Sequence, residues 1–189
     1  MPEALRQHVA GLTDAQLHYQ PEGGYFSVLE NVCHLRDIEI EGYGVRLRRL
    51  LAEVHPTLPD INGGQLASER RYSEQDCEPA LNAFTQARHG NLRILGSMTG
   101  PQLSRAAFLE DVGEVTLGRL LELWVEHDRG HIHELVAGMT KTSRSGRPLL
   151  HASPLPPLTP HLSSIGEGTR RKEKPRRSGV FLSTYLSDQ

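Results

Sequence analysis

Three histidines have the type and spacing needed to hold a metal ion. They are His34 and, much later in the chain, His127 and His131. His127 and His131 are four residues apart, and on a helix this spacing stacks two imidazoles on one face, close enough to bind the same ion. His34 lies in a separate apolar stretch, so a second helix can bring a third ligand. Three protein ligands leave one position open, as a catalytic metal requires and a structural metal does not.

The neighbours of the histidine pair exclude one metalloprotease motif. In the His-Glu-x-x-His motif, a glutamate directly after the first histidine acts as general base. Here that position is Asp128, whose side chain is one methylene shorter, so the motif is not met. His133 follows His131 by two residues and points to another side of the helix, so we expect it at the surface. The acids Glu126, Asp128 and Glu134 could form hydrogen bonds with the ligand histidines.

A capping box opens the helix that carries His34. Ser27 is followed three residues later by Glu30, and apolar residues at helical spacing continue beyond them, which predicts a helix over residues 27–53. Glu30 and Asp37 lie about one turn on either side of His34. They are the candidate acid–base or orienting groups of the site. The alternative is that each carboxylate only caps the helix or faces solvent.

The remaining elements are also mainly helical. Apolar spacing predicts helices over residues 3–19, 78–97 and 116–139, whereas residues 104–115 resemble short strands. The long connection over residues 56–77 is of a length that is often functional in a compact domain. The sequence therefore predicts an all-α protein, a four-helix bundle. Bundles of this kind build metal sites from inward side chains on facing helices.

Composition divides the chain after the histidine pair. Residues 1–140 contain 12 Arg, no Lys and 20 acidic residues, a net charge of −8, whereas residues 141–189 contain nine Lys or Arg and three acidic residues, a net charge of +6. Half of the 12 prolines also lie in this last part. We predict a bundle domain over 1–140 and a disordered, basic, Pro/Ser/Arg-rich tail over 141–189. A shifted reading frame would also explain the change in composition.

Other features of the sequence indicate a soluble cytoplasmic protein. The two cysteines, Cys33 and Cys77, do not form a disulfide framework, and their scarcity suits a reducing compartment. The N-terminus has no basic start followed by an apolar run, and no apolar stretch approaches the roughly 20 residues of a membrane span. Cys33 precedes His34 but lies on a different helix face, so we expect a buried, unreactive thiol.

Two segments resemble the signatures of a known family. Residues 27–37 (SVLENVCHLRD) and residues 116–131 (TLGRLLELWVEHDRGH) are similar to the first and last signatures of the DinB/YfiT-like superfamily, and the resemblance extends over residues 3–139. It implies an up-and-down four-helix bundle and a divalent metal held by His34, His127 and His131. The chain departs from the family at Phe26, where a tryptophan is usual, and its first helix is short.

The resemblance also implies a class of reaction. Several relatives are thiol-dependent S-transferases or isomerases that use bacillithiol, mycothiol or glutathione, and many have no assigned reaction. We therefore expect a metalloenzyme with Zn, Ni or Fe, the metals that suit imidazole ligands. The metal would activate a water or thiol as a Lewis acid. The reaction would be S-transfer from a low-molecular-weight thiol to a small electrophile, or a metal-dependent hydrolysis.

A non-enzymatic function is the alternative. The bundle could be a metal-binding or dimerising module, in which Trp124 or the 56–77 connection contacts a partner, and we expect a homodimer. Nucleic-acid binding through the basic cluster at residues 170–177 is a third hypothesis. The net charge of −8 over the bundle disfavours extending such a contact beyond the tail.

Overall fold

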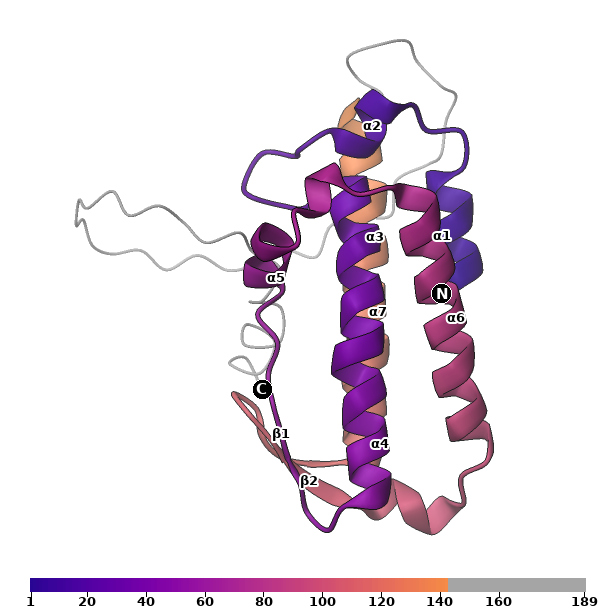
Figure 1. The fold of residues 1–189 in the computed structure, drawn as a ribbon, viewed down its shortest axis with the longest axis vertical. Coiled ribbons are helices and arrows are strands. Elements are labelled where there is room, and N and C mark those ends of the chain that lie inside the picture. Colours follow the sequence, from indigo (N-terminus) through magenta and orange to yellow (C-terminus); the bar gives the residue numbers. More distant parts are fainter. Residues whose placement is uncertain (143–189) are drawn as a thin grey trace, which may run out of the picture.

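The structure, a computed structural model, describes residues 1–142, so nearly all of the predicted tail lies outside the described residues. Long helices run side by side along the molecule (Figure 1). One continuous rod consists of α3 (Val28–Asp37), a π-helix (Ile38–Tyr43) and α4 (Gly44–Ala52). It packs with α6 (Cys77–Gly96) and α7 (Leu117–Thr142). The short α1 (Pro2–Val9) packs against α6 and α7. The predicted all-α four-helix bundle is confirmed.

Side-chain caps start the two helices that carry the histidines. Ser27 Oγ accepts a hydrogen bond from the Glu30 amide at 3.2 Å, and the Glu30 carboxylate accepts one from the Ser27 amide at 2.9 Å. Thr116 Oγ1 accepts a hydrogen bond from the Arg119 amide at 3.1 Å at the start of α7. Each cap supplies a partner for amides that have none within the helix. The predicted capping box and the predicted start of the last helix are both confirmed.

The prediction of one helix over residues 3–19 is wrong. The structure has two short helices there, α1 and α2 (Asp14–His18). Gly11 adopts φ +76°, a left-handed conformation that ends a helix, and Thr13 then caps α2 through a hydrogen bond from the Gln16 amide. Leu5 of α1 is fully buried in the bundle, whereas α2 packs against α3 and none of its residues is buried.

A small sheet closes the end of the bundle at which α4 finishes (Figure 1). The predicted short strands are present as β2 (Ala106–Leu109) and β3 (Gly113–Thr116), which pair antiparallel. A third strand, β1 (Thr57–Leu58), pairs parallel with β2 and comes from the long connection after α4. That connection also contains α5 (Gly63–Glu69) and a 3-10 helix (Tyr72–Glu74), so it is largely structured.

The core has two clusters of buried apolar residues. The first surrounds Leu29, Val32 and Phe84, and the second surrounds Tyr43 and Trp124 beside the sheet. The α3–α4 rod contributes to both clusters. No helix within residues 1–142 is long and apolar enough to cross a lipid bilayer.

The π-helix in the middle of the rod was not expected from the sequence. The Gly44 amide donates to the carbonyl of Glu39, five residues earlier, instead of to the residue four earlier as in an α-helix. The extra residue in this turn buries both Glu39 and Tyr43. A Cβ atom on Gly44 would lie 2.8 Å from the Glu39 carbonyl oxygen and 3.1 Å from the Asn91 amide. Glycine at position 44 therefore permits this close backbone approach.

We expect Gly44→Ala to destabilise the protein by about 1–3 kcal/mol, because the new methyl group overlaps backbone that cannot move freely. Gly90→Ala is the matched control, since a Cβ atom there has nothing within 4 Å. Gly90 lies inside α6, and alanine should stabilise that helix by about 0.5–1 kcal/mol. Urea denaturation of both variants measures these changes. Equal stability of Gly44→Ala and the unsubstituted protein would contradict the role of Gly44.

Candidate metal centre

The structure brings the three predicted histidines together between α3 and α7. One nitrogen from each of His34, His127 and His131 lies within 4.8 Å of those from the other two. The ring centroids are separated by 5.4 Å for His34–His127, 4.7 Å for His34–His131 and 4.5 Å for His127–His131. The Nε2 atoms of His34 and His127 are 3.3 Å apart. The helical spacing of four residues and the facing helix therefore produce the expected cluster, and these three residues could bind one metal ion.

Aromatic side chains from both core clusters flank the histidines. The Phe26 ring lies 5.3 Å from that of His34, and the Tyr43 ring lies 5.7 Å from that of His127. Tyr43 in turn stacks on Trp124, with ring centroids 4.9 Å apart and planes within 3° of parallel. These rings surround the imidazoles with apolar surface. Phe26, where the resemblance led us to expect tryptophan, supplies an aromatic wall beside His34.

Burial favours the neutral form of two of the imidazoles, those of His34 and His127. His34 and His131 are 1% and 4% exposed, whereas His127 is half-buried. Burial, together with the neighbouring His131, lowers the pKa of His34 and of His127 well below 6.5. Neutral imidazole is the form that binds metal, because its nitrogen lone pair is free. Within residues 1–142, the buried Nδ1 atoms of His34 and His127 have no hydrogen-bond partner. The donor set fits a divalent transition metal.

The sequence model described as the DinB superfamily matches residues 1–135. The chain belongs to the DinB superfamily. A Bacillus subtilis relative, YfiT, is named as a candidate metal-dependent hydrolase. It is 30% identical over 146 residues, which cover 76% of this chain and 79% of the relative. A Geobacillus thermodenitrificans relative with the same description is 26% identical over 138 residues, covering 72% of this chain and 77% of its own length.

Solved structures include a similar fold. The structure of Bacillus subtilis YfiT, reported as a four-helix bundle of unusual topology, superposes on this chain with a TM-score of 0.67. The two are 26% identical in sequence, and the match covers 76% of this chain and 80% of the YfiT chain. The bundle of this DinB-superfamily chain is therefore shared with a protein of known structure.

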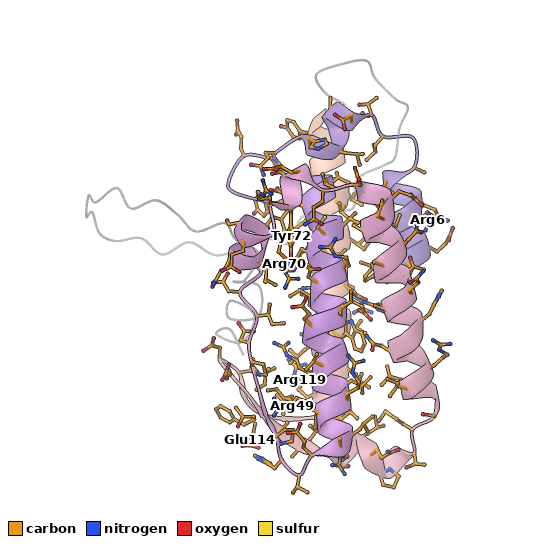
Figure 2. The ribbon with its side chains drawn as sticks, viewed as in Figure 1. Arg6, Arg49, Arg70, Tyr72, Glu114 and Arg119 are labelled. Carbon is orange, nitrogen blue, oxygen red and sulfur yellow. The ribbon has the colours of Figure 1, made fainter. Side chains whose placement is uncertain are left out.

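Asp37, one of the two candidate acid–base residues, is held in a dense polar network. Its carboxylate accepts hydrogen bonds from Arg36 at 2.6 Å, from the Tyr72 hydroxyl at 2.7 Å and from Arg70 at 2.8 Å. Arg70 and Tyr72 lie together beside α3 (Figure 2). Burial alone would raise the pKa of Asp37, but the hydrogen bonds from Arg36 and Tyr72 outweigh it and lower the pKa. An ionised carboxylate with these partners fixes the 56–77 connection to α3, and a catalytic role for Asp37 stays a prediction.

Glu30, the other candidate, is the buried partner in the capping box of α3. Besides the Ser27 amide, its carboxylate accepts a hydrogen bond from Gln20 at 2.5 Å. Its role beyond the cap stays a prediction. The neighbouring Cys33 is fully buried, and burial raises the pKa of its thiol to about 12. This agrees with the expected unreactive thiol, because the thiolate is the reactive form.

A buried ion network beside His127 was not predicted from the sequence. Arg88 on α6 donates to both oxygens of Asp128 at 2.6 and 2.9 Å, and lies 2.8 Å from the carboxylate of Glu39. Trp124 Nε1 also donates to Glu39, at 3.2 Å. Asp128 is thus engaged by Arg88. The network links the π-helix, α6 and α7 next to the metal-site candidates. Such long-range pairs leave no periodic signal in the sequence.

His131 contacts polar side chains on α3 and α7, whereas its near neighbour His133 does not share its environment. His131 Nδ1 lies 2.7 Å from Asn31 Oδ1 and 3.4 Å from the carboxylate of Glu134. His133 is exposed, as expected from its position on α7. Asn31 received no role from the sequence. A signal was nevertheless present, since Asn31 is three residues before His34 and therefore faces the same side of α3.

The stability of the metal-free protein should fall as the pH drops below about 6.5. The unfolded chain takes up protons on His34 and His127 near that pH, whereas the folded state keeps both imidazoles neutral. Each histidine should remove up to about 1.4 kcal/mol from the free energy of unfolding per pH unit, and stability should be level above about pH 7.5. Urea denaturation in chelator at pH 7.5, 6.5 and 5.5 measures this slope.

The control is the double variant His34→Gln and His127→Gln. It removes the two histidines whose pKa the fold lowers, so its stability should depend less steeply on pH over the same interval. An unchanged slope in the double variant would show that other groups cause the pH dependence.

Proposed function

We propose that this protein is a metal-dependent enzyme in which His34, His127 and His131 hold one divalent ion. The observation that carries the proposal is the convergence of their three ligand nitrogens within 4.8 Å between two helices. Two of the three residues are almost fully buried, and buried histidines without a shared function would be costly to group in this way. The description of both relatives as candidate metal-dependent hydrolases supports the same function.

The donor set supports a particular kind of metal chemistry. Three imidazole ligands suit Zn, Ni or Fe. Because neutral ligands leave the charge of the ion uncompensated, a metal held here would supply Lewis-acid polarisation of a water, a thiol or a substrate oxygen. Three protein ligands are the number found in catalytic zinc sites, which keep a further position for a reactant.

The surrounding residues of the chain have separate tasks in this proposal. Phe26 and Tyr43 exclude water from the sides of the imidazoles they contact, which lowers the local dielectric and strengthens electrostatic interactions there. Glu30 and Asp37 hold the two ends of α3, on which His34 is carried. We assign them to positioning of the helix. The partial exposure of His127 leaves a side from which a reactant can approach.

We propose hydrolysis of a small substrate as the reaction. The names of the relatives favour it. S-transfer from a low-molecular-weight thiol to an electrophile uses the same ligand set and differs in the group that is activated, so it is the second candidate. A metal-binding or dimerising module without catalysis is the third, and a homodimer is compatible with each of them.

Purified protein loaded with Zn²⁺ should contain one ion per chain. The double variant His127→Ala and His131→Ala should lose this ion, because only one of the three ligands remains. Elemental analysis after gel filtration measures the stoichiometry. His133→Ala is the matched control, since His133 lies on the same helix but is exposed, and it should retain one ion per chain. The proposed site would be wrong if the unsubstituted protein bound no zinc at saturating Zn²⁺. It would also be wrong if the double variant retained its zinc in full.

The reaction is tested on the metal-loaded protein with two sets of substrates. Small chromogenic esters and amides should be hydrolysed without added thiol, and the activity should disappear with chelator and return with the metal. Electrophiles mixed with bacillithiol, mycothiol or glutathione form the second set. Turnover that requires a thiol would replace hydrolysis by S-transfer. Full metal occupancy without turnover in either set would favour the non-enzymatic module.

A further inference from the structure

The three imidazoles differ in the hydrogen-bond partner of their Nδ1 atom. His131 Nδ1 lies 2.7 Å from Asn31 Oδ1, a hydrogen bond that crosses from α7 to α3. Within residues 1–142, the corresponding Nδ1 atoms of His34 and His127 are buried without a partner. His131 is therefore the one of the three histidines whose Nδ1 is held by a hydrogen bond to another helix.

The hydrogen bonds of Asn31 determine which of its two amide atoms faces His131. Its Nδ2 donates to the carbonyl oxygen of Ser27 at 3.2 Å and is 3.4 Å from that of Phe26. Carbonyl oxygens only accept, so the NH₂ group must face them and Oδ1 must face His131. Since Oδ1 is also an acceptor, Nδ1 of His131 must carry the proton.

This proton position has a direct consequence for the ligand atom. A neutral imidazole carries one proton, so with Nδ1 protonated the Nε2 atom of His131 keeps a free lone pair. Asn31 is 1% exposed and His131 is 4% exposed, so water does not compete freely for this bond. The hydrogen bond selects one tautomer of His131 and restricts rotation of its ring.

Glu134 is the other group beside the same nitrogen. Its Oε2 lies 3.4 Å from His131 Nδ1, and it is on the same helix, three residues later. Its negative charge also favours a proton on Nδ1. At the longer distance, however, it orients the ring less than the 2.7 Å bond to Asn31 does. Replacement of Glu134 therefore serves as the control that removes the charge and leaves the Asn31 bond.

We infer that Asn31 is a positioning residue for the metal centre, which fixes His131 as the Nδ1–H tautomer and presents Nε2 to the ion. This inference rests on the proposed function, because it assigns His131 as a ligand. An aspartate could not replace Asn31 without loss, since a carboxylate cannot donate to the Ser27 and Phe26 carbonyls. The amide donates on one side and accepts on the other, and both are used.

The tautomer is tested first in metal-free protein at pH 7.5. Two-bond ¹H–¹⁵N correlation spectra distinguish a protonated Nδ1 from a protonated Nε2 on each histidine. Unsubstituted protein and Glu134→Gln should both show His131 with a proton on Nδ1. Asn31→Leu should show a mixture of tautomers, or a proton on Nε2. A proton on Nε2 of His131 in the unsubstituted protein would overturn the inference without the need for any variant.

Zinc affinity is then measured by competition with a chromophoric chelator. Asn31→Leu should bind Zn²⁺ about 10–100-fold more weakly, the usual effect of removing a group that orients a ligand histidine. Glu134→Gln should stay within about threefold of the unsubstituted protein. Circular dichroism confirms that each variant is folded. The inference is wrong if Asn31→Leu is folded and binds zinc as tightly as the unsubstituted protein.

The two proposals fail in different ways. If the unsubstituted protein does not bind zinc, the proposed function fails and the inference fails with it, whatever the tautomer. If it binds one ion per chain but Glu134→Gln weakens binding and Asn31→Leu does not, the metal centre stands and the role assigned to Asn31 belongs to Glu134.

Discussion

The register of α7 against the α3–α4 rod decides whether three imidazoles meet. A slip of one residue would turn every side chain of α7 by about 100° and move it by about 1.5 Å along the axis, which would separate His127 and His131 from His34. Two hydrogen bonds prevent such a slip. The Tyr43 hydroxyl donates to the backbone carbonyl of Leu123 at 3.2 Å, and Trp124 donates to Glu39. Both anchors lie within about one turn of His127.

The buried ion network acts on the same register from the third helix. Arg88 holds Asp128 of α7 and Glu39 of the π-helix together, one cation between two carboxylates. Such pairs add little net stability over apolar packing, but breaking one leaves an uncompensated buried charge at a cost of about 3–5 kcal/mol. Misaligned packing of the helices is therefore disfavoured more strongly than correct packing is stabilised. The network therefore favours one packing of the π-helix, α6 and α7, and the meeting of the three histidines depends on that packing.

Local sequence signals predicted the features that depend on nearby residues. The four-residue spacing of His127 and His131, the capping box at Ser27 and the short strands around β2 and β3 all follow from residues close to one another in the chain. The break at Gly11 was missed because a single glycine is tolerated within a helical pattern, and only its left-handed conformation reveals the end of the helix. The strand β1 was missed because its partner in β2 lies about fifty residues away.

Features that depend on distant residues could not be obtained in this way. The partners Glu39 and Arg88 are almost fifty residues apart, and their charges resemble those of any solvent-facing helix until the helices are packed. The π-helix is also invisible to an analysis based on a period of 3.6 residues, since it changes that period for a single turn. Asn31 is a different case, because its position on the His34 face of α3 was readable, but its acceptor role requires the orientation of a side chain on α7.

The π-helix changes the periodicity of the rod, so that the side chains before and after it follow two different helical registers. Ile38 and Tyr43 are five residues apart, yet both belong to the core cluster beside the sheet, and Leu47 and Leu50 follow with ordinary α-helical spacing. If all six of these residues were instead wound as regular α-helix, the extra residue would rotate everything after it by about 100° relative to α3. The half that carries His34 would remain in place, while the half that fills the second cluster would turn toward solvent. The extra residue therefore lets one helix satisfy two differently oriented halves of the core.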